Sequence, residues 1–205
     1  MKKNTLKMAA ISLAVVTLTA CGGGSDDSNP EQAPGPLSKY EGTWSPGCDG
    51  ENERQTISFT TLANGTKLGM NMQNEFFNQA NCTGGIVATG TYGPPQPAAT
   101  VTYLETVANA SVRLPNGQTI QASVDRVSTA GSGASFAYTG SGVQGTTVIS
   151  GKKYWRIAYG GGSTLINVND ASGTSVGALL LLNGELLELE PITSNYYRVI
   201  SQQTR

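Results

Sequence analysis

Hydrophobic and polar residues alternate along many short stretches of the chain, which is the pattern of β-strands with one buried face. In residues 67–73, the apolar side chains of Leu68, Met70 and Met72 alternate with glycine and amide residues. Three Asn-Gly dipeptides separate pairs of such stretches, and because both residue types tolerate a positive φ, each dipeptide predicts a tight hairpin. These dipeptides are Asn64-Gly65, Asn116-Gly117 and Asn183-Gly184.

The expected strands are short and follow one another closely. They are residues 39–44, 56–62, 67–73, 86–92, 100–107, 110–114, 118–127, 135–138, 143–150, 153–159, 165–168, 178–182, 185–190 and 196–200. Short strands joined by tight turns predict an all-β fold, either an antiparallel up-and-down β-barrel or a β-sandwich. The composition agrees, because 26 of 205 residues are glycine and only 13% are charged, whereas long amphipathic helices need charged solvent faces.

The chain begins with basic residues and a short apolar run. Lys2, Lys3 and Lys7 precede the apolar residues 8–18, an arrangement typical of a secretory signal peptide. The run is too short for a membrane span, which needs about 20 apolar residues. It ends in Leu18-Thr19-Ala20-Cys21, which resembles the lipobox of bacterial lipoproteins at all four positions.

The resemblance to bacterial lipoproteins implies that residues 1–20 are a signal peptide and that Cys21 is the lipidated first residue of the mature protein. The expected attachment to the membrane is through this N-terminal lipid, because two or more acyl chains hold a protein stably on a bilayer. Gly22 follows the cysteine, where aspartate would imply retention at the inner membrane. The resemblance therefore implies a bacterial outer-membrane location, with the periplasmic face and the cell surface both left open.

The remainder of the chain divides by composition into two parts. Residues 21–36 comprise the lipidated cysteine and a Gly-, Ser- and Pro-rich segment, which we expect to be a disordered tether. Residues 37–205 are long enough for one β-rich domain with a sizeable core. This domain has ten basic and eleven acidic residues, so it has no charge excess to attract nucleic acid. Its oligomeric state stays open.

Two cysteines remain once Cys21 carries lipid. Cys48 and Cys82 lie outside the cytoplasm if the signal peptide is functional, and an even pair in an oxidising compartment favours a disulfide. Such a bond would tie the loop after the first strand to the turn after the second hairpin. The alternatives are two buried thiols or a reactive thiol, and the chain contains no histidine to activate the latter.

The first expected strand contains the triplet Gly42-Thr43-Trp44. This triplet resembles the opening motif of the lipocalins, whose tryptophan closes one end of an eight-stranded barrel under an arginine near the final strand. The resemblance implies a lipocalin-like β-barrel, with Trp44 and Arg198 as the barrel-closing residues and Arg156 as the second candidate. The Thr-Asp-Tyr motif of that family is absent from this chain.

The chain contains no histidine, the residue on which most hydrolytic mechanisms depend. Without histidine there is no Ser-His-Asp or Cys-His mechanism and no His-ligated metal site. Carboxylates are the remaining route, and Glu185, Glu188 and Glu190 are the densest acidic group on an expected strand. Glu188 and Glu190 share a face, which we interpret as an ordinary wet surface. We therefore expect no enzyme activity.

Two further segments match binding motifs only in part. The acidic residues 49–53 have arginine and threonine where a calcium-binding EF-hand loop needs glycine and glutamate. Residues 140–145 have the Gly-x-Gly-x-x-Gly spacing, but a strand is expected after them where a dinucleotide site needs a helix. We therefore expect no metal and no cofactor.

Two functions remain compatible with the sequence. The first is binding of a small apolar ligand inside the β domain, and the second is a structural or interaction role in the cell envelope, docking to a protein or a glycan. The same apolar residues would line a pocket or fill a closed core. These candidates are Leu68, Met70, Met72, Val101, Tyr103, Trp155 and Ile157.

Overall fold

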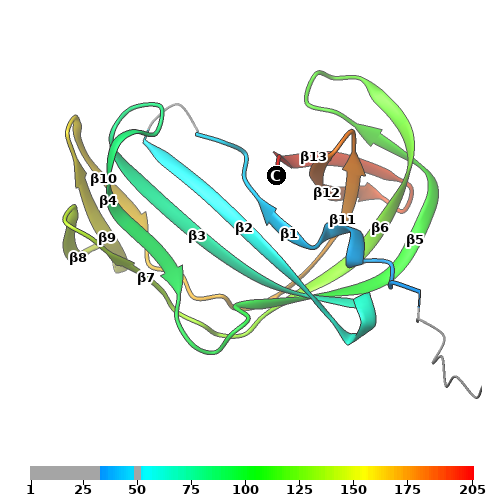
Figure 1. The fold of residues 1–205 in the computed structure, drawn as a ribbon, viewed down its shortest axis with the longest axis horizontal. Helices are drawn as coiled ribbons and strands as arrows, with labels where there is room; N and C mark the ends of the chain where they lie inside the picture. The colour runs from blue at the N-terminus through cyan, green and yellow to red at the C-terminus, as the bar shows by residue number, and fades with distance from the viewer. Residues whose placement is uncertain (1–32, 49–51) are drawn as a thin grey trace, which may run out of the picture. The chain divides into compact units, whose positions relative to one another are not determined.

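The computed structural model describes residues 33–48 and 52–205, and one compact unit spans Pro34–Arg205 (Figure 1). The described residues form strands and two short 3₁₀ helices, without an α-helix, so the all-β prediction is confirmed. Within them, no helix is long and apolar enough to cross a membrane. The elements are η1 (Ser38–Tyr40), β1 (Gly42–Trp44), β2 (Glu53–Leu62), η2 (Ala63–Gly65), β3 (Lys67–Gln79), β4 (Thr83–Tyr92), β5 (Ala99–Arg113), β6 (Thr119–Gly131), β7 (Phe136–Thr139), β8 (Val143–Ile149), β9 (Lys152–Tyr159), β10 (Gly162–Asn167), β11 (Thr174–Leu182), β12 (Glu185–Thr193) and β13 (Tyr196–Gln203).

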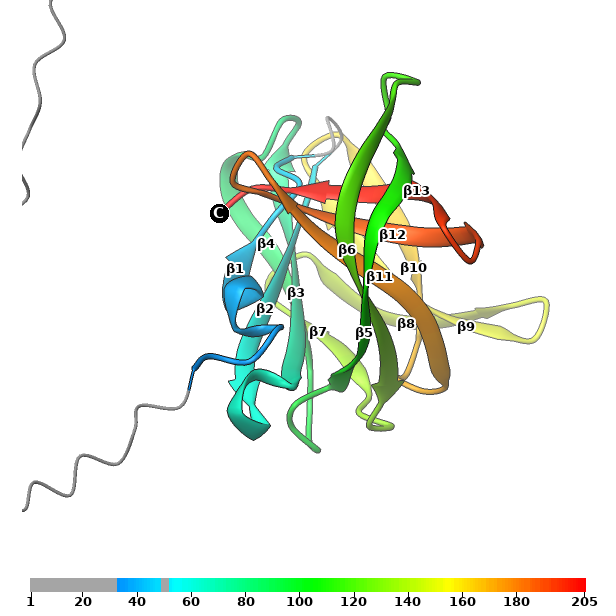
Figure 2. The same cartoon turned by 90° about the vertical axis from the view of Figure 1, so that its right-hand side faces the viewer.

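Eight strands are connected by antiparallel pairings that return to their starting point. The pairings run β1–β2–β3–β5–β6–β11–β12–β13. Ser45 and Thr204 then close the cycle, since each backbone N–H donates to the other residue's carbonyl at 2.9 Å. Figures 1 and 2 both place the C-terminal end of β13 beside β1. We call these eight strands the strand ring.

The long strand β5 changes partners along its length. Its first residues pair with β3, whereas Ser111–Arg113 pair with Tyr196–Arg198 of β13 in the one parallel pairing among the described strands. The register with β6 shifts between Val107 and Ala110, where Asn109 has a positive φ. The sequence predicted two separate strands here, and the structure has one strand with a local irregularity.

Three groups of buried side chains hold the unit together. The first fills the strand ring and includes Trp44, Phe59 and Leu68. The second lies on the opposite face of β11 and β12 and includes Leu180 and Leu187. Both faces of these two strands are therefore buried, which explains the nearly continuous run of leucines in residues 178–189.

The third core lies between the small sheet β8–β10 and the strands β3, β4 and β7. Its buried residues include Phe76, Tyr138 and Ile157, with Trp155 packed against them. Five aromatic side chains are linked by ring contacts here, and burial raises the pKa of Tyr138 to about 12. Trp155 and Ile157 therefore belong to this core, which is the closed-core alternative that the sequence left open for them.

The three expected hairpins are present, but one turn differs in detail. Asn64 and Gly65 both have a positive φ, as do Asn183 and Gly184. In the Asn116-Gly117 turn, only Gly117 has a positive φ, and its N–H donates to the carbonyl of Leu114 at 3.0 Å. Asn-Gly thus marked each turn correctly, although one of them closes with a single left-handed residue.

The end of the expected tether packs on the domain. Most of residues 21–36 lie outside the described part of the chain. Gly35, however, contacts the β2–β3 turn so closely that a Cβ there would overlap the backbone of Asn64 and Gly65. The buried Leu37 follows, and its N–H donates to the carbonyl of Gly65 at 2.9 Å. The ordered unit therefore begins before residue 37.

Candidate functional site

A cavity of about 420 Å³, which we call the ring cavity, lies inside the strand ring. One wall comes from β2 and β3, and the other walls come from β5, β6, β11 and β12, because alternation directs every second side chain of each strand to this interior. Val176 and Ile200 are exposed at its edge, so the cavity opens to solvent there. Its inner lining includes Phe59, Met70, Val101, Val127, Thr129, Leu179 and Glu188.

A second cavity of about 320 Å³ adjoins the first. Met70, Thr129 and Ser175 line both, so the two hollows lie side by side along β3 and β6. Met72 and Tyr92 line the far part. The combined space is mostly apolar, as is typical of sites for small hydrophobic molecules.

Glu188 is the half-buried carboxylate of the ring cavity. On β12 it follows the ring-facing Leu186 by two residues and therefore shares its face. Gln203 of β13 donates through Nε2 to Glu188 Oε1 at 2.9 Å. Burial raises the pKa of Glu188, and the hydrogen bond from Gln203 lowers it by less. The expectation that Glu188 lies on a wet surface is thus wrong.

Gln203 is the buried polar partner of Glu188. Its side chain is only 1% exposed, and Nε2 also lies 3.1 Å from the hydroxyl of Ser201. Within the described part of the chain, Gln203 Oε1 has no hydrogen-bond partner. A buried amide oxygen without a partner costs free energy. Glu188 lines the cavity, and Gln203, which does not line it, donates to the Glu188 carboxylate.

A hydrogen-bonded group ties η1 to the strand ring. Tyr40 Oη lies 2.7 Å from Asp125 Oδ2 and 2.9 Å from the carbonyl of Leu179; its single proton serves the carboxylate. Lys39 Nζ and the Thr106 hydroxyl each contact the same buried carboxylate at 2.7 Å. Burial and the neighbouring carboxylate raise the pKa of Tyr40 well above its ordinary range. The N-terminal segment is thus anchored by a satisfied buried charge.

Trp44 also packs in the ring core. It is 1% exposed, and its Nε1 donates to the carbonyl of Tyr40 at 2.8 Å. Gly42 has a φ of +129°, a conformation that L side chains rarely adopt, which accounts for glycine in the Gly-x-Trp triplet.

The arginine that covers Trp44 is Arg205. Its guanidinium carbon lies 4.6 Å from the centroid of the tryptophan ring, and Nη2 donates to the carbonyl of Glu41 at 2.9 Å. Arg198 instead forms an exposed ion pair with Glu190, and Arg156 lies on β9. The expectation that Arg198 closes the ring over Trp44 is therefore wrong.

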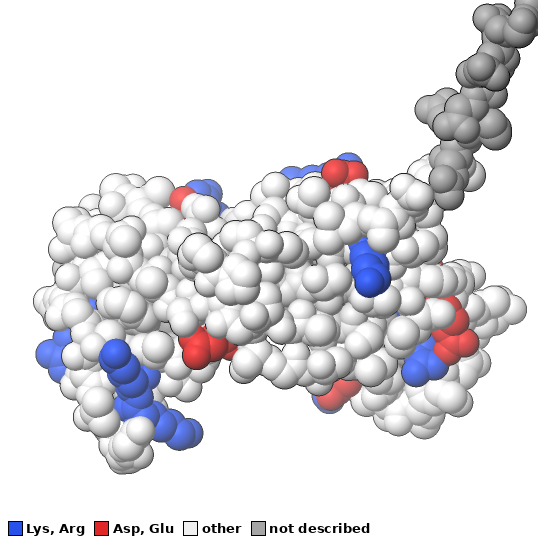
Figure 3. Space-filling model, turned by 90° about the horizontal axis from the view of Figure 1, so that it is seen from below, with Lys and Arg blue, Asp and Glu red and all other residues white. Residues whose placement is uncertain are grey.

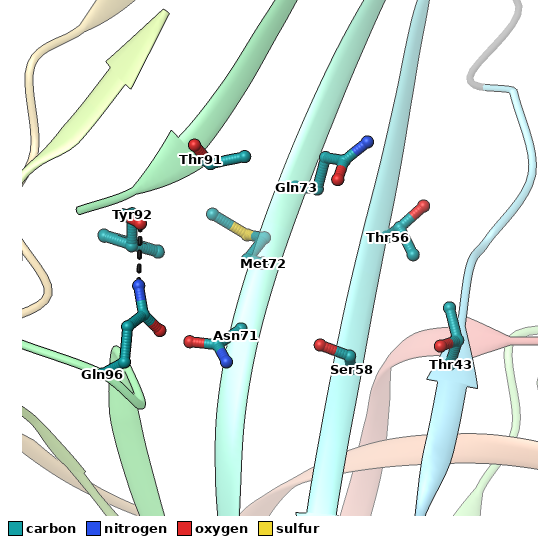
Figure 4. A pocket seen from close by; sticks show the side chains of 9 residues that line it. All are labelled: Thr43, Thr56, Ser58, Asn71, Met72, Gln73, Thr91, Tyr92 and Gln96. Carbon is teal, nitrogen blue, oxygen red and sulfur yellow. Dashed lines mark hydrogen bonds between the residues drawn. The ribbon is translucent and has the colours of Figure 1, made fainter. Parts of the chain in front are cut away.

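A polar groove of about 380 Å³ lies on the outer face of β1–β4 (Figure 4). Two cross-strand rows form its floor, one of Thr43, Ser58 and Asn71 and the other of Thr56, Gln73 and Thr91. Gln96, which donates to the carbonyls of Tyr92 and Gly93, borders it. All of the residues that line the groove are uncharged.

The hydroxyls of this groove are available to a ligand. Among residues 33–48 and 52–205, those of Thr43, Thr56, Ser58 and Thr91 form no hydrogen bond with the protein. The groove therefore offers neutral donors and acceptors in two parallel rows.

The disulfide prediction is confirmed. Cys48, just after β1, is bonded to Cys82 in the β3–β4 turn, with the Cα atoms 5.8 Å apart. Cys21 lies outside the described residues, as does most of the acidic segment 49–53. In the described part of the chain, no three His, Cys, Asp or Glu side chains form a metal-binding group. The glycine-rich residues 140–145 lead into strand β8.

Sequence reasoning found only part of the ring cavity. Met70 and Val101 were expected as lining, and both contribute to it, with Met72 in the adjoining space. Phe59, Val127 and Leu179 were missed. Alternation could have identified these three residues, because each lies two residues from another apolar or interior position on an expected strand. The sequence does not show which strands pair, and this pairing is what brings the three residues around one cavity.

Comparison with known protein families, with known proteins by sequence and with solved structures finds no match for this chain.

Proposed function

We propose that this protein is a lipid-anchored envelope protein whose strand ring acts as a lipocalin-like barrel and binds a small, mainly apolar molecule. The observation that supports this function is the ring cavity, whose mainly apolar lining includes the half-buried carboxylate of Glu188 and the more exposed Glu190. Its volume of about 420 Å³ falls in the range of small-molecule sites, roughly 300–1,000 Å³.

The polar groups of the cavity favour one kind of ligand. Glu188 and Glu190 present carboxylate oxygens and Thr129 and Ser175 present hydroxyls, whereas the other side chains of the lining are aliphatic, aromatic or thioether. A hydrophobic molecule with one hydroxyl or amine donor would hydrogen-bond to the Glu188 carboxylate.

Native mass spectrometry of the protein purified from its own host tests this function. A reproducible non-covalent adduct of small mass is expected in the wild type and is expected to disappear in Thr129→Phe, which fills the space shared by both cavities. Ala130→Phe, on the exposed side of the same strand, is the matched control and should retain the adduct. Retention of the adduct in both variants would reject the ring cavity as the site.

The proposed membrane attachment rests on the lipobox-like sequence at Cys21. Cys21→Ser is expected to abolish acyl labelling and to change either processing or membrane partition. Wild-type partition with unchanged acyl labelling would contradict the lipid anchor, without bearing on the ring cavity.

The polar groove favours a second candidate function, recognition of a neutral glycan. Its four hydroxyls without a partner among the described residues and its three amide side chains match the hydroxyl groups of a sugar, and its lining has no charge to select an ion. Thr56→Val combined with Ser58→Ala should weaken binding in a neutral-glycan array, whereas Thr60→Val, outside the groove, should not. An array without any signal for the wild type would reject this candidate.

A further inference from the structure

The small sheet β8–β10 differs in charge from the rest of the domain. Residues 143–167 contain Lys152, Lys153 and Arg156 and no acidic residue, whereas residues 37–205 as a whole are slightly acidic. Among the described residues, none of these three cations forms an ion pair. Figure 3 shows basic side chains gathered at the end of the molecule where Figure 1 places this sheet.

Exposed aliphatic side chains lie beside these cations. Val148 is 67% exposed, Ile149 is 45% exposed and Leu165 is 41% exposed, although large aliphatic residues gain free energy when buried. The strand register places each of them opposite one cation. The pairs are Val148–Lys153, Ile149–Lys152 and Leu165–Arg156.

The first two pairs form the end of the β8–β9 hairpin, next to its turn at Ser150 and Gly151. Figure 2 shows this hairpin projecting from the rest of the unit. Trp155 and Ile157, further along β9, are packed in the third core. The hairpin is therefore held firmly at its base and presents aliphatic and cationic groups together at its tip.

We propose that the tip of the β8–β9 hairpin docks on the surface of an anionic phospholipid bilayer. Aliphatic side chains insert at the boundary of headgroups and acyl chains, while neighbouring lysines contact lipid phosphates, the combination that interfacial binding requires. A soluble polyanion would use the lysines but would leave Val148 and Ile149 in water. The inference is independent of the ring cavity and of lipidation at Cys21.

Vesicle co-sedimentation of residues 34–205, which form the compact unit without the basic and apolar N-terminal segment, tests the proposal. The protein is expected to bind vesicles of phosphatidylcholine with 30% phosphatidylglycerol more tightly than vesicles of phosphatidylcholine alone. Lys152→Gln with Lys153→Gln should weaken binding to the anionic vesicles roughly 25-fold. Lys67→Gln with Arg113→Gln, two exposed cations elsewhere, makes the same charge change and should have little effect. Equal loss in the two variants would overturn the proposal.

A second variant separates bilayer docking from simple charge attraction. Val148→Ser with Ile149→Ser leaves the charge unchanged and should weaken binding to the anionic vesicles at least fivefold, with an unaltered circular dichroism spectrum. Millimolar inorganic phosphate should not displace the wild type. Unchanged binding of the serine variant, or displacement by phosphate, would show an anion site that does not use the bilayer and would overturn the proposal.

Discussion

The guanidinium of Arg205 stacks on the ring of Trp44, although the two residues belong to opposite ends of the domain sequence. The stacking stands next to the Ser45–Thr204 bridge that closes the strand ring. Arg205 also donates to the carbonyl of Glu41, so one side chain covers the tryptophan and satisfies a backbone group beside it. The ring is therefore closed by backbone pairing and by side-chain stacking at the same place.

Removing this stacking should cost more than removing an ordinary surface arginine. Arg205→Ala should lower the free energy of unfolding by about 1–2 kcal/mol, because a cation–π contact and a hydrogen bond are lost together. Arg198→Ala breaks only an exposed ion pair with Glu190 and should cost about 0.5 kcal/mol or less. Urea denaturation of both variants measures the difference, and equal losses would contradict the role of Arg205.

The Cys48–Cys82 disulfide should contribute strongly to stability. It joins residues 34 positions apart, and the chain-entropy model gives about 3–4 kcal/mol for a loop of this size. Cys48→Ser with Cys82→Ser should lower the free energy of unfolding by that amount. Reduction of the wild type should lower the free energy of unfolding by the same amount. A reduced protein as stable as the oxidised one would contradict this contribution of the disulfide.

Glu188 should make the protein less stable as the pH rises. Burial raises its pKa above the ordinary 4.5, so the unfolded chain releases this proton at a lower pH than the folded protein does. The folded state then binds more protons between the two pKa values, and the free energy of unfolding falls as the pH rises through that window.

Glu188→Gln removes this effect. The variant should be more stable than the wild type at pH 7.5, and its free energy of unfolding should depend less on pH above 4.5. Glu190→Gln, whose carboxylate is about half exposed and paired with Arg198, should keep the wild-type slope. Urea titrations at several pH values provide the measurement, and identical slopes for all three proteins would be evidence against a buried Glu188.

Gly35 should be intolerant of even the smallest side chain. Its backbone rests against the β2–β3 turn, where a Cβ would overlap Asn64 and Gly65. Gly35→Ala should therefore destabilise the unit by about 1–3 kcal/mol. Gly85 has open space around it, and Gly85→Ala should change stability by less than about 1 kcal/mol. Thermal melting of the two variants distinguishes these outcomes.

Local pattern was sufficient for most of the strands. Alternation and Asn-Gly turns found the three hairpins because both signals depend on neighbouring residues and on backbone preference alone. The pairing of cysteines could be predicted as well, since only two remained after the lipobox-like Cys21. The boundary at residue 37 was less accurate, because the close packing of Gly35 depends on a turn that is distant in sequence.

Hydrophobic alternation does not show which strands pair when they are distant in the sequence. Arg198 has the expected place near the last strand, but the chain continues past the end of β13 to the bridge at Thr204, so a later arginine reaches Trp44. Alternation also made Glu188 look solvent-facing, because Leu187 and Leu189 already formed one apolar face. Only the ring closure shows that the second face of β12 is covered too.

The most direct test of the ring cavity is a titration with a neutral fluorescent probe, N-phenyl-1-naphthylamine, which brightens in apolar surroundings. Wild type and Ala130→Phe should bind one molecule with the same affinity, and Thr129→Phe should lose at least tenfold in affinity because the introduced ring occupies the space between Met70 and Ser175. Thr129→Phe with wild-type affinity and stoichiometry would contradict a binding site inside the strand ring.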